Sequence, residues 1–520
     1  MDVVIVGGGP SGLLMGCELA LAGVRAVVLE RLPERSSRPK ANGLVGRVVQ
    51  ALDYRGLYER FGGVAGPPVP APSFQFGALP LDLTGWAENA LYTLPVPQWR
   101  MEESLEERAR ELGVEIRRGH EVTAIEQDDE AVTIEALGPD GGYRLSAAFL
   151  VGADGGHSTV RKQSGIGFPG FTDDGFVARS GQVVIHPPVA VPGTGDLEVP
   201  GKVGRLRSAS FTRTETGVFA FGMFQPGIYR VGVQEWGRPR ESARTDSSIE
   251  DLRAAVRRVL GADVPMSEPP ADRAPSPATV TRGVNSRLAD RYRQGRVFLV
   301  GDAAHVQSGV GGPGLNLGLQ DVLNLGWKLA AAVKGWAPDG LLDSYQNERR
   351  PAGERVIMHS RAQTALLSPG PNITALREVL GELLDDRANA RRLSDLLSGA
   401  DLRYDMGVAG PGHPLVGGWM PDLVLGTEAG RVRVAELLRT GRPVLLDLAG
   451  RTDLVAAAED WAGRVDVIAA TGAALPAQAV LIRPDGYVAW AAQAGGGADE
   501  LREALRTWFG APVPAGVVGR

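Results

Sequence analysis

Short apolar runs alternate with helical patterns through the first third of the chain. Apolar runs over 3–6 and 26–30 flank a helical pattern that begins after Gly12, and helices are expected over 48–57 and 100–112. A buried strand is expected over 148–154. This alternation of strands and helices predicts an α/β fold with a parallel sheet.

From about 168 to 285 the hydrophobic positions change to period two, which predicts an antiparallel sheet. The α/β pattern then returns with an apolar strand over 296–301 and long helices over 315–333 and 341–367. Strands near 444–448, 465–469 and 478–490 predict a small α/β domain at the end. We therefore expect the antiparallel sheet to be inserted between two halves of one nucleotide-binding domain.

A glycine motif joins the first strand to the first helix. Gly7 permits the tight turn, Gly9 lets backbone amides approach a pyrophosphate, and Gly12 lets the helix pack on the strand. Glu30 ends the second strand, where a carboxylate accepts ribose hydrogen bonds and disfavours a phosphate. The motif predicts a non-phosphorylated dinucleotide site. A second glycine pattern over 309–314 lacks such a following acid, so we interpret it as a different loop.

The bulk composition excludes several functional classes. The 520 residues are 43% hydrophobic and 22% charged, as in a soluble globular protein of roughly two to four domains. A net charge of −6 argues against nucleic-acid binding. No apolar run could span a membrane and no signal region precedes the first strand, so we expect a cytoplasmic protein. Cys17 is the only cysteine and no histidine pair has ligand spacing, so we expect no metal.

Three separated motifs point to one family: the glycine turn with Glu30, the segment 152–161, and the segment 301–316. Together they make this chain similar to FAD-dependent aromatic hydroxylases of the p-hydroxybenzoate hydroxylase type, in the larger subgroup that acts on polyketides and phenols. The resemblance implies a Rossmann-like FAD-binding domain, an inserted antiparallel-sheet substrate domain and a thioredoxin-like C-terminal domain without CxxC. The corresponding segments are 1–168 and 286–368 for the FAD domain, 169–285 for the substrate sheet, 369–420 for a helical connector and 421–520 for the C-terminal domain.

The resemblance also implies which residues contact the cofactor. It assigns the glycine turn to the FAD pyrophosphate, Asp302 to the ribityl chain, and amides at Leu315 and Asn316 to the flavin pyrimidine edge, where the helix dipole stabilises negative charge. The full cofactor set is Gly7, Gly9, Ser11, Gly12, Glu30, Arg31, Lys40, Gln98, Val122, Asp154, Asp302, Pro313, Gly314, Leu315 and Asn316.

This chain departs from the family pattern at two places. Lys40 stands where relatives carry an arginine, and lysine loses the bidentate fork, which bears on how the nicotinamide cofactor is handled. Gln307, Ser308 and Gly309 replace a histidine and paired prolines beside the flavin ring. We interpret the nearby His305 as a buttress that stabilises the loop by hydrogen bonding.

The resemblance implies an NADPH-consuming monooxygenase that activates dioxygen as a flavin hydroperoxide and hydroxylates an aromatic polyketide-type or phenolic substrate. No catalytic base is identified, and the candidates for the substrate pocket are Arg47, Phe221, Met223 and Gln307. Two alternatives stay open: Baeyer-Villiger oxygen insertion on a polycyclic ketone, and a flavin-bound protein that binds a small molecule without turnover. The C-terminal domain is expected to be structural or to form a homodimer surface.

Overall fold

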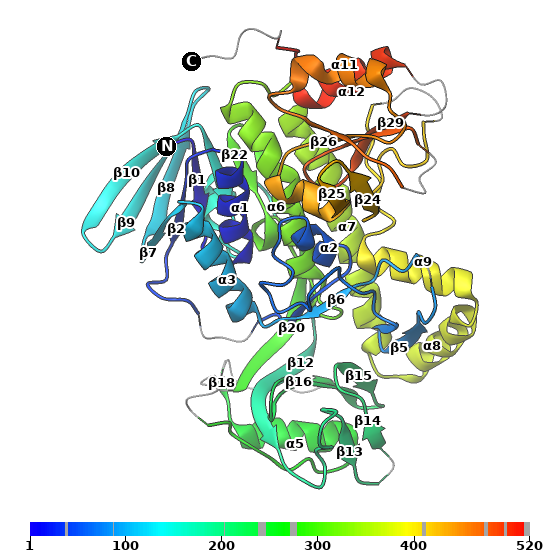
Figure 1. Ribbon diagram of the computed structural model, residues 1–520. Helices are drawn as coiled ribbons and strands as arrows, with labels where there is room; N and C mark the ends of the chain where they lie inside the picture. The colour runs from blue at the N-terminus through cyan, green and yellow to red at the C-terminus, as the bar shows by residue number, and fades with distance from the viewer. Residues whose placement is uncertain are drawn as a thin grey trace.

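The computed structural model describes residues 1–36, 40–86, 88–201, 203–237, 246–270, 278–407, 412–472, 477–492 and 497–513. Figure 1 shows a large body around the N-terminal strands, a lobe below it built on a long curved sheet, and a smaller unit that holds the C-terminal strands. Within the described part, no helix is both long and apolar enough to cross a membrane.

A six-stranded sheet forms the centre of the body, in the order β21-β22-β11-β1-β2-β7. All its neighbouring pairs are parallel except β21 with β22. Strand β1 is fully buried, which explains its continuous apolar run, because helices cover parallel sheets. The strands are β1 (Val3–Val6), β2 (Ala26–Glu30), β7 (Glu115–Arg118), β11 (Phe149–Gly152), β21 (Arg293–Gln294) and β22 (Val297–Leu299).

Helices of the body pack against one another as well as on this sheet. Helix α1 contacts both α3 and α6, and α6 contacts α7. The helices are α1 (Pro10–Leu21), α2 (Val48–Asp53), α3 (Gln98–Glu111), α4 (Thr159–Gln163), α6 (Pro313–Val333) and α7 (Leu341–Leu367). Helix α2 ends earlier than the sequence pattern predicts, and α6 begins two positions earlier, with Pro313 in the first turn, where proline is tolerated.

Three small antiparallel groups complete the body. One is a three-stranded sheet beside β7, and the others are the pairs β3-β6 and β4-β5. Their strands are β3 (Gly43–Val45), β4 (Ser73–Phe76), β5 (Leu79–Asp82), β6 (Thr93–Pro95), β8 (Glu121–Gln127), β9 (Val132–Gly138) and β10 (Gly141–Ala147). The pair β4-β5 packs on the connector helices α8 (Pro371–Leu384) and α9 (Arg387–Ser398).

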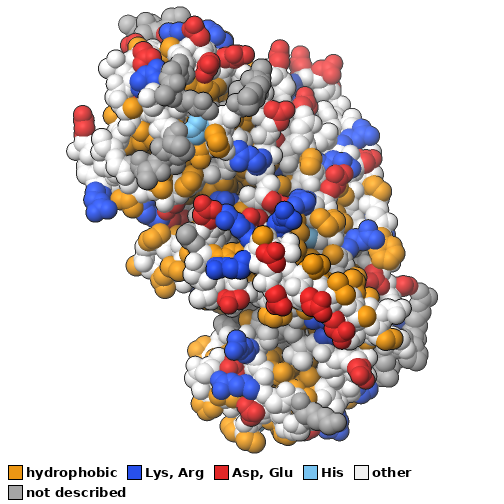
Figure 2. All heavy atoms as spheres, turned by 90° about the vertical axis from the view of Figure 1, so that its right-hand side faces the viewer, with side chains coloured by type: hydrophobic (Ala, Val, Ile, Leu, Met, Phe, Trp, Pro, Cys, Tyr) orange, Lys and Arg blue, Asp and Glu red, His pale blue; other side chains and the backbone are white. Residues whose placement is uncertain are grey.

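The lower lobe is the antiparallel sheet that the period-two pattern predicts. Its main order is β15-β16-β17-β12-β20-β18, with β19 and β23 attached to β12 and β20. Helix α5 (Ile249–Leu260) packs on one face of this sheet and buries its apolar side chains there. Figure 2 shows the lobe below the main body, with acidic and basic side chains interspersed over the visible surface.

The strands of this lobe are β12 (Gly170–Ile185), β13 (Leu197–Val199), β14 (Gly204–Leu206), β15 (Ser210–Arg213), β16 (Gly217–Gln225), β17 (Ile228–Trp236), β18 (Asp246–Ser247), β19 (Met266–Ser267), β20 (Ala278–Leu288) and β23 (His305–Val306). The two long strands β12 and β20 run from the body into the lobe (Figure 1). They therefore hold the sheet in a fixed position against the nucleotide domain.

The C-terminal unit has a four-stranded sheet in the order β27-β26-β28-β29. Strands β26 and β27 are parallel, and the other two pairs are antiparallel, which is the thioredoxin-like arrangement that the resemblance implies. The elements are β24 (Val424–Thr427), β25 (Gly430–Arg433), α10 (Val434–Leu437), β26 (Val444–Asp447), α11 (Thr452–Ala458), β27 (Asp466–Ala469), β28 (Ala479–Ile482), β29 (Val488–Ala492) and α12 (Ala498–Phe509).

A buried charge cluster joins this unit to the body. The fully buried Arg483 donates to both carboxylate oxygens of Glu348 on α7, at 2.7 Å each. Lys328 on α6 donates to the same carboxylate at 2.8 Å. Burial alone would raise the pKa of Glu348, but the two cations hold it well below its ordinary value. The carboxylate is therefore the ionic centre of the contact between the two units.

Replacement of Glu348 by alanine should destabilise the protein by about 3–5 kcal/mol, because Arg483 and Lys328 would remain buried with too little negative charge. Urea unfolding followed by circular dichroism measures this loss. The matched control is Glu354→Ala, which breaks the more exposed pair with Arg350 and should change stability by less than about 0.5 kcal/mol. Equal effects of the two substitutions would contradict the assignment.

Candidate active site

The turn after β1 leaves a space that suits a diphosphate. A Cβ atom on Gly7 or Gly12 would collide with backbone oxygens, at 2.3 Å from Ala153 O and 1.9 Å from Gly7 O respectively. A Cβ on Gly9 would meet no atom within 4 Å. The first two glycines are therefore required for packing, whereas Gly9 borders open space at the start of α1, where free amides and the helix dipole attract an anion.

Glu30 lies beside this turn with both carboxylate oxygens already engaged. One oxygen accepts from the Gly8 amide at 2.6 Å, and the other accepts from the Leu32 amide at 2.9 Å. Each oxygen retains a second lone-pair site, so the carboxylate is held rigidly and can still accept from a ribose hydroxyl. This geometry agrees with the role that the sequence predicts for the end of β2.

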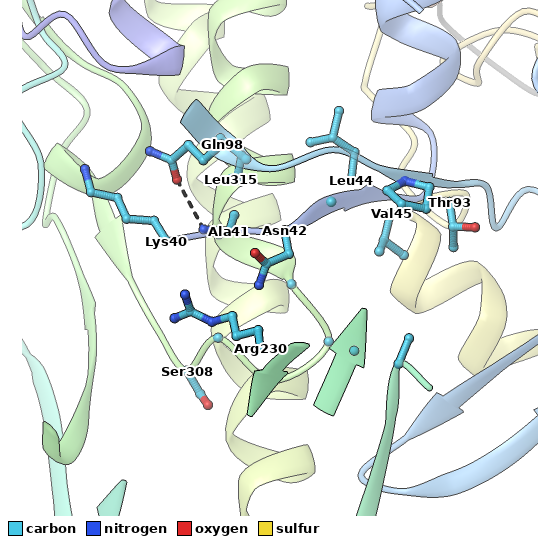
Figure 3. A pocket seen from close by; sticks show the side chains of 18 of the residues that line it. Lys40, Ala41, Asn42, Leu44, Val45, Thr93, Gln98, Arg230, Ser308 and Leu315 are labelled. Carbon is cyan, nitrogen blue, oxygen red and sulfur yellow. Dashed lines mark hydrogen bonds between the residues drawn. The ribbon is translucent and has the colours of Figure 1, made fainter. Parts of the chain in front are cut away.

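A single cavity of about 830 Å³ connects the glycine turn to the antiparallel sheet. Gly9 and Asp302 border one part of it, the loop of Gln307 and Ser308 borders another, and Arg230 on β17 borders the sheet side (Figure 3). The cavity runs from the glycine turn of the first domain to the antiparallel sheet of the second. It therefore has room for an extended cofactor and for a separate substrate. The wall is formed by segments far apart in the chain, including 40–45, 93–95, 209–211, 220–222 and 306–309.

The start of α6 faces the same cavity. Gly312 has a left-handed conformation with φ of 69°, Pro313 follows it, and Gly314 and Leu315 line the cavity. Asn316 fixes this turn, because its side chain donates to Gly312 O at 2.7 Å and accepts from the Val45 amide at 3.1 Å. The unpaired amides of a helix start are therefore presented to whatever occupies the cavity.

Comparison with known proteins shows to which family this chain is related. Residues 1–360 match the FAD binding domain family, and residues 413–512 match the family described as aromatic-ring hydroxylase, C-terminal. The chain is 44% identical to the 12-dehydrotetracycline 5-monooxygenase/anhydrotetracycline 6-monooxygenase of Streptomyces rimosus, over 98% of this chain and 99% of that protein.

Two further matches cover similar lengths. The rifampicin monooxygenase of Streptomyces venezuelae is 38% identical over 98% of this chain and 99% of its own length. The solved structure of OxyS anhydrotetracycline hydroxylase from Streptomyces rimosus superposes with a TM-score of 0.84 at 42% identity, covering 98% of this chain and 99% of that chain. The chain belongs to the FAD-dependent aromatic-ring hydroxylase family. It is an FAD-dependent monooxygenase.

Several residues that the resemblance assigns to FAD line the main cavity. The cavity is lined by Gly9, Ser11, Lys40, Gln98, Asp302, Gly314 and Leu315. Gln98 accepts from the Ala41 amide at 3.4 Å and donates to Glu102 at 2.7 Å, which ties α3 to the Lys40 segment (Figure 3). Burial raises the pKa of the Asp302 carboxyl, while His305 and Lys40 oppose that shift.

Other assigned residues lie outside the cavity wall. Asp154 accepts from Ser158 Oγ and from the amides of Thr159 and Val160, so it stabilises the start of α4, and burial raises its pKa. Arg31 is exposed and Val122 is buried in the core of β8. Pro313 borders a separate cavity of about 40 Å³ behind the α6 turn. Direct contact of these residues with FAD stays a prediction.

The structure also places the four candidates for the substrate pocket. Gln307 lines the cavity, and its buried side-chain oxygen has no partner among the described residues. Phe221 contributes to the wall, but its ring stacks on Phe219 in the core beneath α5. Met223 is 37% exposed and packs near Gly195, while Arg47 lies 5.7 Å from the Trp419 ring, so neither belongs to the cavity wall.

His305 has the supporting role that the sequence analysis predicted. Its Nε2 lies 2.7 Å from Asp321 on α6, and both side chains are completely buried. The other carboxylate oxygen of Asp321 accepts from Arg349 on α7 at 2.8 Å. The loop that follows Asp302 is therefore joined to two long helices.

Sequence reasoning missed the residues that form the sheet side of the cavity, namely Ala220, Gly222, Arg230 and Gly232. Alternation along β16 and β17 places these on the face opposite Phe219, Phe221 and Val231. Of the candidates named from the sequence on these strands, Phe221 does border the cavity, although its ring also packs in the core. Side chains alternate between the two faces of a strand, so the positions between the core residues of β16 and β17 face the cavity. Assigning those positions to the cavity would have identified Arg230.

Gly9→Val should abolish most FAD binding without unfolding the hydroxylase, because its side chain would occupy the open space beside α1 rather than collide with protein. We expect at least a hundredfold weaker FAD affinity, measured by flavin fluorescence during reconstitution, with an unchanged circular dichroism spectrum. Gly463→Val, also at an open position but in the C-terminal unit, is the matched control and should retain FAD. Normal FAD content in Gly9→Val would contradict the proposed phosphate cradle.

Proposed function

We propose that this enzyme hydroxylates an aromatic polyketide-type or phenolic substrate with dioxygen and NAD(P)H as co-substrates. The observation that carries the proposal is the single cavity of about 830 Å³ that joins the Gly9 turn to the antiparallel sheet. Support for the substrate class comes from the anhydrotetracycline and rifampicin monooxygenases, whose names describe aromatic polyketide-type compounds. NADPH is the preferred donor in this proposal.

When bound, FAD would supply the redox chemistry by which two electrons from NAD(P)H activate dioxygen, so that one oxygen atom enters the aromatic ring and the other leaves as water. Backbone amides at Gly9 and Ser11 and the carboxylates of Glu30 and Asp302 would bind and orient the cofactor. The amides at the start of α6 would favour negative charge on a cofactor ring held there, because they lie at the positive end of the helix dipole.

The sheet side of the cavity has a largely apolar wall. Phe74, Leu44, Phe211 and Leu315 contribute carbon surface, whereas charged groups are few. A dry cavity protects a reactive oxygen species from unproductive loss as hydrogen peroxide. The residues of this chain therefore act mainly by positioning and shielding.

Hydroxylation is favoured over the two alternatives raised by the sequence. Oxygen insertion into a ketone and ligand binding without turnover receive no support from the monooxygenase and hydroxylase relatives. A cytoplasmic location and a homodimer remain predictions, the latter testable by sedimentation equilibrium of the purified enzyme.

Addition of anhydrotetracycline to the FAD-loaded enzyme should accelerate NADPH oxidation at least tenfold, because substrate-dependent reduction avoids wasteful oxygen consumption. Product mass should increase by one oxygen atom, labelled when the reaction runs under ¹⁸O₂, and NMR should show a new hydroxyl on an intact ring system. Ring expansion would instead support Baeyer-Villiger insertion. Tight FAD binding with no stimulation by anhydrotetracycline or a panel of phenolic polyketides would contradict the proposal.

A further inference from the structure

Arg230 is the long cationic side chain on the cavity face of the sheet. Its neighbours along β17, Tyr229 and Val231, point the other way and pack in the core beneath α5. Across β16 and β17, the other residues of the cavity face are small: Ala220, Gly222 and Gly232. A Cβ on Gly232 would come no closer than 4.0 Å to another atom, so open space lies beside the arginine.

No described residue pairs with the Arg230 side chain through a hydrogen bond or an ion pair. Burial lowers its pKa, and no acidic neighbour opposes that shift. Other enclosed arginines with lowered pKa values have partners: Arg161 donates to Ala303 O, Arg213 to Ser368 O, and Arg377 to Leu366 O. Arg230 differs from them because its charge faces only the cavity.

An arginine stays ionised at physiological pH, so partial enclosure without an anion costs free energy. Among the residues that the structure describes, the charged side chains that line the cavity are Lys40, Asp302 and Arg230. Asp302 interacts electrostatically with Lys40, not with Arg230. The elements next to Arg230 present neutral groups, since Gln182 is its partner on β12 and Gly222 its partner on β16. Because the described residues supply no anion to Arg230, we look to a ligand for it.

We propose that Arg230 binds an ionised oxygen of the substrate, so that the enzyme selects aromatic compounds with an acidic phenol or an enolised 1,3-dicarbonyl group. This inference rests on the proposed function for the identity of the ligand as the substrate. The planar guanidinium matches the two oxygens of an enolised dicarbonyl through paired hydrogen bonds. In Figure 3 the side chain extends between Asn42 and the Ser308 loop, within the cavity.

The interaction has a chemical consequence as well as a selective one. An oxygen held as an anion donates electron density to the ring carbons ortho and para to it, where an electrophilic oxygen is accepted. Arg230 would thus lower the apparent pKa of that substrate oxygen, because a nearby cation favours the charged form. The residue binds and orients substrate, and no proton transfer by Arg230 is required.

The test compares full-length, FAD-loaded wild type with Arg230→Gln and Arg230→Lys. Arg230→Gln keeps a hydrogen-bond donor but loses the charge. Arg230→Lys keeps the charge but loses the paired N–H donors of the planar guanidinium. Arg207→Gln is the matched control, since Arg207 is exposed in the same lobe and its loss changes net charge equally. The probes are anhydrotetracycline and alizarin, and dissociation constants are measured by fluorescence or absorption titration across the pH range in which their acidic oxygens ionise.

Wild type should bind both probes tightly above the pKa of the acidic oxygen and lose affinity as pH falls below it. Arg230→Gln should raise the dissociation constant roughly ten- to hundredfold at high pH and flatten this pH dependence. Arg230→Lys should retain the pH dependence with an intermediate affinity. Arg207→Gln should match wild type, and all four proteins should contain equal FAD.

The inference is overturned if neither probe binds wild type more tightly than Arg230→Gln at high pH. Arg230→Gln could instead lose FAD or show a shifted flavin absorption spectrum, while its FAD-loaded fraction binds the probes as wild type does. That result would show that Arg230 contacts the cofactor, and it would also overturn the inference. Arg230-dependent binding without turnover would count against hydroxylation but support this inference. Turnover of a probe that binds equally well with and without Arg230 would support hydroxylation and overturn this inference.

Discussion

The contact between Gly7 and Gly12 is the constraint on which the rest of this enzyme depends. The carbonyl of Gly7 occupies the place that a side chain at position 12 would fill, so α1 can begin directly above β1. That approach fixes the direction of the helix start and leaves the open space at Gly9. The open space at Gly9 and the packing of α1 on β1 thus arise from the same few backbone atoms.

A second set of contacts holds the far end of the cavity. Asp321 joins the loop of His305 to Arg349, and Asn316 joins the start of α6 to the β3 segment. These buried polar groups lie on helices that also contact the C-terminal unit through Glu348 and Arg483. The thioredoxin-like unit therefore supports the helices behind the main cavity, although none of its described residues lines the wall of that cavity.

Local sequence signals predicted the architecture well because each depends on neighbouring residues. The β1 turn, the period-two sheet and the long helices of the second half are all readable from spacing alone. Partners distant in the chain were not predictable: Asn316 with Val45 is separated by 271 positions, and Glu348 with Arg483 by 135. Arg230 was missed for another reason. Phe221 is conspicuous in the sequence, yet Arg230 on the adjoining strand faces the cavity because side chains alternate along both strands.

The small side chains at Ala220, Gly222 and Gly232 leave the sheet boundary of the cavity nearly bare. A larger side chain at any of these positions would reduce the volume of the cavity without disturbing the core on the opposite face, because alternation separates the two. Evolution could thus diversify the molecules accepted by this scaffold through one or two point changes, at little risk to folding. Enzymes with this fold can therefore differ in the compounds that they accept while they keep the same core.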